Sequence, residues 1–128
     1  MPETTPFAAH IGLDWGDKHH DLCLQVAGTS TFEHSRVPHC PRELQQWARA
    51  IEKRFQGAPV AVALELQRGP IVSILERFPF LQLFFVNPGM LAKYREAFSP
   101  SRAKDDPTDA ALALELLLRH PERLTLIE

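Results

Sequence analysis

Long apolar runs are missing from the sequence, and its start has neither the basic residues nor the apolar core of a secretory signal. These absences argue against a membrane-spanning or secreted protein, so we expect a soluble protein in the cytoplasm. Cysteine is also scarce. Cys23 and Cys40 lie far apart, and neither has the CxxC or cysteine-histidine spacing of zinc ligands. We therefore expect two reduced thiols, with no disulfide and no zinc site.

Excess positive charge is another feature that the sequence lacks. The formal net charge is -2 at pH 7 and the pI is near 6.3, which argues against a protein that holds nucleic acid by bulk positive charge. Contact with nucleic acid would need a local basic cluster, or domains outside this chain. One basic cluster is present, although a run of this kind is also typical of a solvated loop. It contains Lys93, Arg95, Arg102 and Lys104.

The chain does contain enough apolar sequence for one globular domain. It has 128 residues, of which 45% are hydrophobic, and no internal repeat, low-complexity tract or interdomain linker. We therefore take residues 1–128 as a single domain. Residues 9–37 show short alternating patterns with a turn at Gly28, which predicts three antiparallel strands. A helical stripe then runs between Pro41 and Gly57, two residues suited to the start and the end of a helix.

The second half of the sequence alternates between buried strands and helices. Residues 59–64 are continuously apolar, as in a central strand covered on both faces, and residues 81–86 repeat this pattern. A short helix over 71–78 between them implies a parallel crossover connection. Further helices are predicted over 90–98 and 107–119, and the residues after them fit either a short strand or a free tail. The sequence thus predicts an α/β fold, with a mixed sheet of three antiparallel strands and then parallel strands, flanked by helices.

Acidic residues follow two of the predicted strands directly. Asp14 ends the apolar segment Ile11-Gly12-Leu13, and Glu65 comes straight after residues 59–64. Ligand and metal sites of α/β folds gather at such strand ends. Each acid also has a simpler interpretation. Asp14 alone fits a turn aspartate, and Glu65 alone fits a strand end that emerges into solvent.

A further pair of acids, Asp106 and Asp109, lies at the start of the last predicted helix. Pro107 suits the first helical position, so we expect Asp106 to be the N-cap and Asp109 the third helical residue on the same side. Helix capping alone would explain this pair. All four acids together suit two hard divalent cations, Mg²⁺ or Mn²⁺, at a phosphodiester-cleaving site. We predict such a site with Asp14 as the bridging ligand, formed by Asp14, Glu65, Asp106 and Asp109.

Four segments of the chain follow one another in the order known from one family. They are Ile11-Gly12-Leu13-Asp14, Leu64-Glu65, Phe85-Val86-Asn87-Pro88 and Lys104-Asp105-Asp106-Pro107-Thr108-Asp109-Ala110. In these segments the chain resembles the DEDD transposases of the IS110 group of bacterial insertion sequences, and the last segment, which is similar to K-x-D-x-x-D-A, is the most specific. The resemblance implies an RNase H-like (RuvC-like) fold and places the family's four acids on Asp14, Glu65, Asp106 and Asp109. After Glu65 the family usually continues x-T-G, whereas this chain reads Leu66-Gln67-Arg68-Gly69-Pro70.

The resemblance also implies an activity and partners. The activity is divalent-metal-dependent DNA cleavage and strand transfer in insertion-sequence transposition. Its partners would be DNA, a structured guide RNA and further copies of the full-length protein in a homo-oligomer. A second, C-terminal domain would supply a serine nucleophile. On this basis we expect residues 1–128 to be the N-terminal part of a longer transposase, with little or no recombination activity alone.

Three other interpretations stay open from the sequence. A free-standing RuvC-like nuclease or Holliday junction resolvase would use the same acids with water as the nucleophile. An actin-like or sugar-kinase-like ATP-binding lobe would use Asp14-Trp15-Gly16 as a phosphate-binding turn, but it also needs a glycine-rich loop, which the six glycines do not form. A non-catalytic binding module would use the acids only as caps and turn residues.

Overall fold

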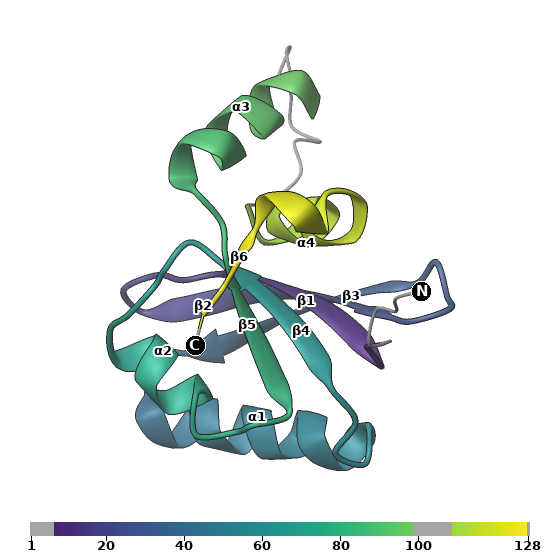
Figure 1. The fold of residues 1–128 in the computed structure, drawn as a ribbon. Coiled ribbons are helices and arrows are strands. Elements are labelled where there is room, and N and C mark those ends of the chain that lie inside the picture. Colours follow the sequence, from purple (N-terminus) through teal and green to yellow (C-terminus); the bar gives the residue numbers. More distant parts are fainter. Residues whose placement is uncertain (1–6, 99–108, 128) are drawn as a thin grey trace.

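The computed structural model describes residues 7–98 and 109–127, which form one sheet with helices on both faces (Figure 1). In chain order the elements are β1 (Ala9–Asp14), β2 (His19–Val26), β3 (Phe32–Pro38), α1 (Pro41–Arg54), β4 (Val60–Leu64), α2 (Pro70–Leu75), β5 (Leu81–Phe85), α3 (Pro88–Phe98), α4 (Asp109–Arg119), a 3-10 turn (Pro121–Arg123) and β6 (Thr125–Leu126). The strands are ordered β3-β2-β1-β4-β5-β6 across the sheet.

The sheet is mixed, as the sequence predicts. Strands β1, β2 and β3 pair in antiparallel fashion, whereas β4 pairs in parallel with both β1 and β5. All five residues of β4 are buried, which confirms a central strand covered on both faces. This arrangement, with its flanking helices, is the RNase H-like fold. The residues after α4 form a 3-10 turn and then β6, which pairs with β5, so the strand interpretation of this segment is correct.

The predicted helix over residues 71–78 is too long by three residues. Helix α2 ends at Leu75. The N–H of Glu76 still donates to the Val72 carbonyl, but those of Arg77 and Phe78 donate to carbonyls three residues back. Such bonds tighten a helix end into a 3-10 turn. Pro79 follows immediately, and proline disfavours helical geometry at the residue before it. The 3-10 turn and Pro79 together keep this helix shorter than its apolar pattern indicates.

Helices α1 and α2 cover one face of the sheet, and α4 covers the other, with α3 beyond α4 (Figure 1). The α1/α2 face is filled by large side chains of β1 and β4, such as Ile11, Leu13 and Leu64. On the opposite face, small residues lie under α4: Ala61 and Ala63 belong to the cluster that packs there. No described helix, in residues 7–98 or 109–127, is long and apolar enough to cross a bilayer.

Gly12 lies where the first turns of α4 pack against β1. A Cβ atom built on Gly12 would lie 2.0 Å from the carbonyl oxygen of Ala110 and 2.6 Å from the backbone nitrogen of Leu114. No side chain larger than hydrogen fits there without a shift of the helix. Contact between backbone and backbone therefore fixes the first turns of α4 on β1, two residues before Asp14.

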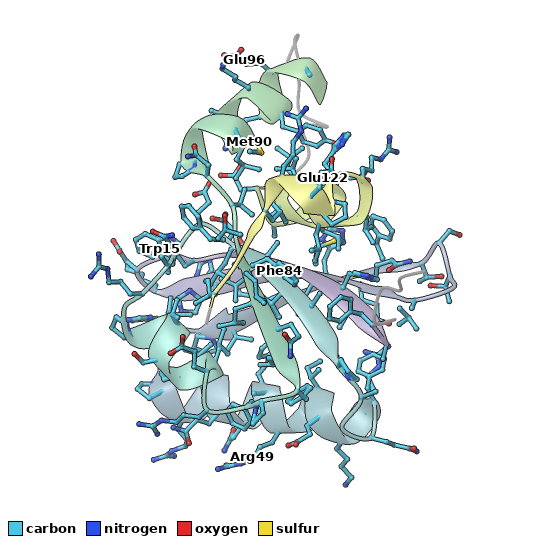
Figure 2. All side chains as sticks on the ribbon, in the orientation of Figure 1. Trp15, Arg49, Phe84, Met90, Glu96 and Glu122 are labelled. Carbon is cyan, nitrogen blue, oxygen red and sulfur yellow. The ribbon has the colours of Figure 1, made fainter. Side chains whose placement is uncertain are left out.

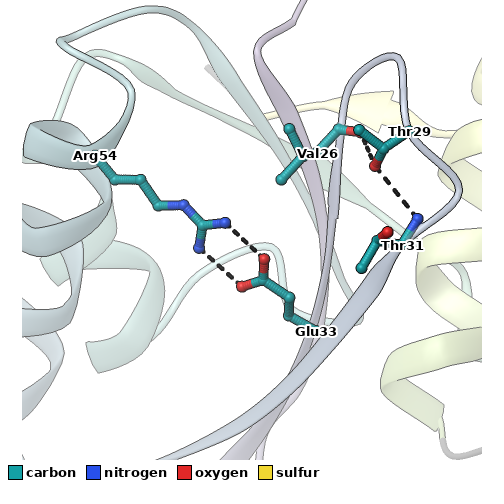
Figure 3. Close-up of polar contacts among 5 residues, drawn as sticks. All are labelled: Val26, Thr29, Thr31, Glu33 and Arg54. Carbon is teal, nitrogen blue, oxygen red and sulfur yellow. Dashed lines mark hydrogen bonds and ion pairs between the residues drawn. The ribbon is translucent and has the colours of Figure 1, made fainter.

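The outer strand β3 is tied to α1 by an ion pair (Figure 3). Arg54 donates from Nη1 and Nη2 to the two carboxylate oxygens of Glu33, at 2.8 and 2.6 Å. Both side chains are exposed, so the pair orients the strand more than it stabilises the fold. At the preceding turn, the Thr29 hydroxyl donates to the Val26 carbonyl. These contacts hold a strand in which Val37 alone is buried.

Candidate active site

Asp14 and Glu65 lie at the same edge of the sheet because their strands are parallel neighbours. Leu13 pairs with Leu64 in register, so each acid comes one residue after this pair. Side chains alternate between the faces of a strand. Since Gly12 and Ala63 face α4, the acids two residues further along each strand are placed on the α4 face as well. Both side chains are half-buried there.

Asp109 lies near the same edge of the sheet but belongs to helix α4. It is the first residue of α4, and the contact of Ala110 with Gly12 places the start of the helix over the end of β1. Burial raises the pKa of Asp14, and the negative charges of Asp109 and Asp21 raise it further. The pKa of Glu65 is also raised by burial, and then by Asp109 and Asp14. Three carboxylates, at the end of β1, just after β4 and at the start of α4, thus share one electrostatic environment.

Arg95 supplies positive charge to this environment. Its Nε donates to Oδ1 of Asp109 at 3.0 Å, and its Nη2 donates to the same oxygen over a shorter distance. The Arg95 charge lowers the pKa values of Asp14 and Glu65, opposing the effect of burial. The hydrogen bonds to Asp109 in turn raise the pKa of Arg95. The sequence places Arg95 in a basic cluster, but gives no sign that it pairs with one of the acids.

The predicted basic residues on α3 point in different directions. Lys93 lines a cavity with Tyr94 and His120, whereas Arg95 points to Asp109. Residues two apart on a helix do not share a face, so these two basic residues do not form one patch. The remaining predicted site residues, Asp106, Arg102 and Lys104, lie outside the described residues.

Asp21 is a nearby acid that the prediction leaves out. It pairs in register with Asp14 across the β1–β2 ladder, and its carboxylate accepts a hydrogen bond from Nε of Arg36 at 3.0 Å. Asp21 and Arg36 also line an open groove of about 340 Å³, together with His34, Ser35 and Ala110. The groove therefore lies beside the carboxylates, between the β2–β3 hairpin and the start of α4.

The donor set fits a hard divalent cation in its chemistry, because carboxylate oxygens are the ligands that Mg²⁺ and Mn²⁺ prefer. A cation would also offset the mutual repulsion that raises the pKa values of Asp14 and Glu65. As they stand, no three histidine, cysteine, aspartate or glutamate side chains in residues 7–98 and 109–127 are positioned to hold a metal ion. One oxygen of Asp109 is taken by Arg95.

The turn after Asp14 is anchored by a buried histidine. The N–H of Gly16 donates to Nδ1 of His20 at 3.1 Å, and His20 Nε2 lies 3.1 Å from Nδ1 of His39. Because His20 Nδ1 accepts, the neutral ring carries its proton on Nε2 and donates it to His39. His20 has no exposed surface. Trp15, in the same turn, is 43% exposed and lies at the edge of the molecule (Figure 2).

Changing His20 should alter how stability depends on pH. Burial, and then the neighbouring His39, lower the pKa of His20. A folded-state pKa below the unfolded value of about 6.5 means that the folded protein binds fewer protons in this range. The stability that neutral His20 contributes is fully present above its unfolded-state pKa. It is lost as the pH falls from that pKa toward the lower pKa of the folded state. We expect the unfolding free energy to fall more steeply below about pH 6.5 in the parent than in His20→Asn, by up to about 1.4 kcal/mol per pH unit.

Urea denaturation at a series of pH values measures this difference. Asp14 and Glu65, whose raised pKa values act in the opposite direction, are present in both proteins and cancel in the comparison. Identical pH slopes for the parent and His20→Asn would show that His20 does not remain neutral in the folded protein.

Comparison with known proteins places this chain in a family. The IS110-type DEDD family, described as transposase, matches residues 11–128. Protein y4uE of Sinorhizobium fredii, named as a transposase, is 27% identical over 123 residues, which are 92% of this chain and 33% of the relative. The mini-circle protein named as a transposase for IS117, from Streptomyces coelicolor, is 27% identical over 108 residues, which are 83% of this chain and 26% of the relative.

The chain thus spans a third or less of the length of these two relatives. The family match, by contrast, begins in β1 and includes every described element after it. It contains the strand end that carries Asp14, the strand end that precedes Glu65, and the helix start at Asp109. The chain belongs to the IS110-type DEDD transposase family, whose members are DNA-processing enzymes.

Proposed function

We propose that this chain is the RuvC-like catalytic domain of a DNA transposase, and that it performs metal-dependent DNA strand cleavage and transfer. The observation that carries the proposal is a placement: Asp14 and Glu65 lie at the same edge of the sheet, and Asp109 begins the helix that rests on Gly12 beside that edge. Helix capping and turn formation do not require acids at the ends of β1 and β4 and at the start of α4 to lie together. A site for divalent cations requires acids from separate elements to converge.

In the proposed site, four acids would hold two Mg²⁺ or Mn²⁺ ions, with Asp14 expected to contact both: Asp14, Glu65, Asp106 and Asp109. Bound ions would activate the attacking oxygen and stabilise the leaving oxygen and the charge on phosphorus. The residues contribute by position: Asp14 and Glu65 are fixed by adjacent strands, and Asp109 by the contact of α4 with Gly12. Rigid elements of this kind hold a catalytic geometry better than loops do.

DNA is the proposed substrate, and four basic residues are proposed to contact its phosphates: Lys93, Arg95, Arg102 and Lys104. The groove beside the carboxylates gives a strand a path past the site, with Arg36 and Ser35 as polar contacts. Because the match to this chain covers only 33% and 26% of the two relatives, we propose that the chain acts as the N-terminal domain of a protein of their length. A C-terminal nucleophile, a guide RNA, homo-oligomeric assembly and a cytoplasmic location belong to that larger proposal.

Metal binding to the chain should raise its melting temperature. A ligand that binds only the folded state stabilises it by mass action, so a metal concentration of about ten times Kd adds roughly 1.4 kcal/mol. For a domain of this size the melting temperature should rise by roughly 3 to 6 °C with Mg²⁺ or Mn²⁺. We expect the double variant Asp106→Ala, Asp109→Ala to lose this rise, as measured by differential scanning fluorimetry.

Asp17→Asn is the matched control, because Asp17 is an exposed acid in the turn after Asp14. It should keep the full metal-dependent rise. For each variant, the melting temperature with metal has to be compared with that of the same variant without metal. Removal of one carboxylate from a repulsive cluster itself changes the metal-free melting temperature. A metal response that survives in the double variant would move the proposed site elsewhere.

A further inference from the structure

Arg95 and Asp109 are paired through a single carboxylate oxygen. Two guanidinium nitrogens, Nε and Nη2, donate to the same carboxylate oxygen, Oδ1 of Asp109. Paired arginine and carboxylate groups often use both oxygens in a fork arrangement, as Arg54 and Glu33 do in this chain. The geometry at Asp109 instead concentrates positive charge on one oxygen, which is how a metal ion approaches a monodentate carboxylate.

The positive charge of Arg95 acts on all three carboxylates. Its electrostatic effect extends to Asp14 and Glu65 as well as to Asp109, and each of these acids acts on Arg95 in return. One guanidinium therefore offsets part of the repulsion in the cluster. Offsetting that repulsion is the role that a divalent cation would have at the same place.

The ion pair between Arg95 and Asp109 is exposed to solvent, so it can break and re-form. The side chains of Arg95 and Asp109 are 42% and 35% exposed, so solvent screens the pair. Helix α3 does not depend on it for attachment. One turn before Arg95, Leu91 is 1% exposed, and Met90 packs beside it against the cluster that includes Leu116 of α4. Figure 2 shows Met90 between α3 and α4, and Glu96 on the outer side of α3.

We propose that Arg95 is a positioning residue that holds Asp109 as an internal cation when no divalent metal is bound, and that metal binding displaces it. The inference rests on the metal site of the proposed function. Anchored at Leu91, α3 can remain in place while the long Arg95 side chain rotates away. The released guanidinium then points its charge toward solvent beside the carboxylates, where the phosphate of a DNA strand would lie.

Removing the Arg95 charge should make metal binding tighter. With Mn²⁺ alone as the probe, measured by isothermal titration calorimetry on this chain, we expect Arg95→Gln to lower Kd by about fivefold. Arg95→Lys keeps the charge and loses the two-nitrogen contact, so its Kd should lie between those of the parent and Arg95→Gln. Lys93→Gln removes the same charge two residues away, on another side of α3, and should leave Kd within about twofold of the parent value.

A second measurement follows the side chain itself. On titration with Mg²⁺, the Nε–H resonance of Arg95 should shift and exchange faster with solvent, as the hydrogen bond to Asp109 opens. Equal Mn²⁺ affinity of the parent and Arg95→Gln, with loss of binding in Asp109→Ala, would overturn the exchange and leave the metal site intact. Absence of Mn²⁺ binding in the parent and in Arg95→Gln would overturn both the exchange and the metal site. Weaker binding by Arg95→Gln would also overturn the exchange, since Arg95 would then support the site.

Discussion

Replacing Asp14 by asparagine should lower the rate of DNA strand transfer by about 10³-fold, in a protein of the relatives' full length that carries this chain. Asparagine has nearly the shape of aspartate but no charge, so β1 and its pairing with β4 should be unaffected. Loss of a bridging ligand removes several kcal/mol of transition-state stabilisation, and about 1.4 kcal/mol corresponds to each tenfold change in rate. Glu65→Gln should behave in the same way.

A transposition assay on a donor plasmid measures this rate, and single-turnover DNA cleavage locates the defect in the chemical step. Asp17→Asn is again the control, because it removes one acid from the adjacent turn and should retain activity. Activity of Asp14→Asn within tenfold of the parent would contradict the proposed role of Asp14. If residues 1–128 alone cleaved branched DNA in the presence of Mg²⁺, the free-standing nuclease interpretation would replace the proposed transposase domain.

Replacing Gly12 by alanine should destabilise the protein by about 3 kcal/mol or more, at the upper end of what overpacking costs. The added Cβ would lie 2.0 Å from the carbonyl oxygen of Ala110. This obstacle is backbone, so no side-chain rotation relieves it, and α4 has to move. The loss is large compared with the roughly 5 to 15 kcal/mol by which domains of this kind are stable. Urea denaturation of both proteins measures it.

Gly28→Ala separates steric cost from conformational cost. A Cβ on Gly28 would meet nothing within 4 Å, but the φ of this residue is +84°. The substitution should therefore cost only the roughly 1 to 2 kcal/mol of a left-handed non-glycine residue. If Gly12→Ala destabilised the protein no more than Gly28→Ala does, the close contact of α4 with β1 would be wrong. Gly12→Ala should also weaken Mn²⁺ binding, because Asp109 begins the displaced helix, whereas Gly28→Ala should not.

Most of the fold could be predicted because each element follows a local pattern. The alternating residues of β1 to β3, the helical stripe of α1 and the continuous apolar run of β4 were each sufficient to assign type and position. Element ends were harder: α2 stops at Leu75, three residues earlier than its apolar residues indicate, and a 3-10 turn before Pro79 follows it. The order of strands across the sheet depends on long-range pairing, which local patterns do not contain.

The site was only partly accessible from sequence. Strand ends and a helix start give the positions of Asp14, Glu65 and Asp109, but their convergence depends on β4 lying next to β1 and on α4 resting on Gly12. Arg95 looks like one basic residue among several, and its pairing with Asp109 spans fourteen positions. His20 has no sequence signal at all, because its role comes from contacts with Gly16 and His39.

The two faces of the sheet should respond differently to changes in side-chain volume. Against α1 and α2, bulky side chains such as Leu64 act as spacers, so a truncation there leaves a void that weakens the domain but keeps its layers in place. Against α4 there is no spacer at Gly12, and main chain rests on main chain. A single methyl group added on that side should therefore displace Asp109, so the geometry of the proposed metal site depends on the smallest residue in β1.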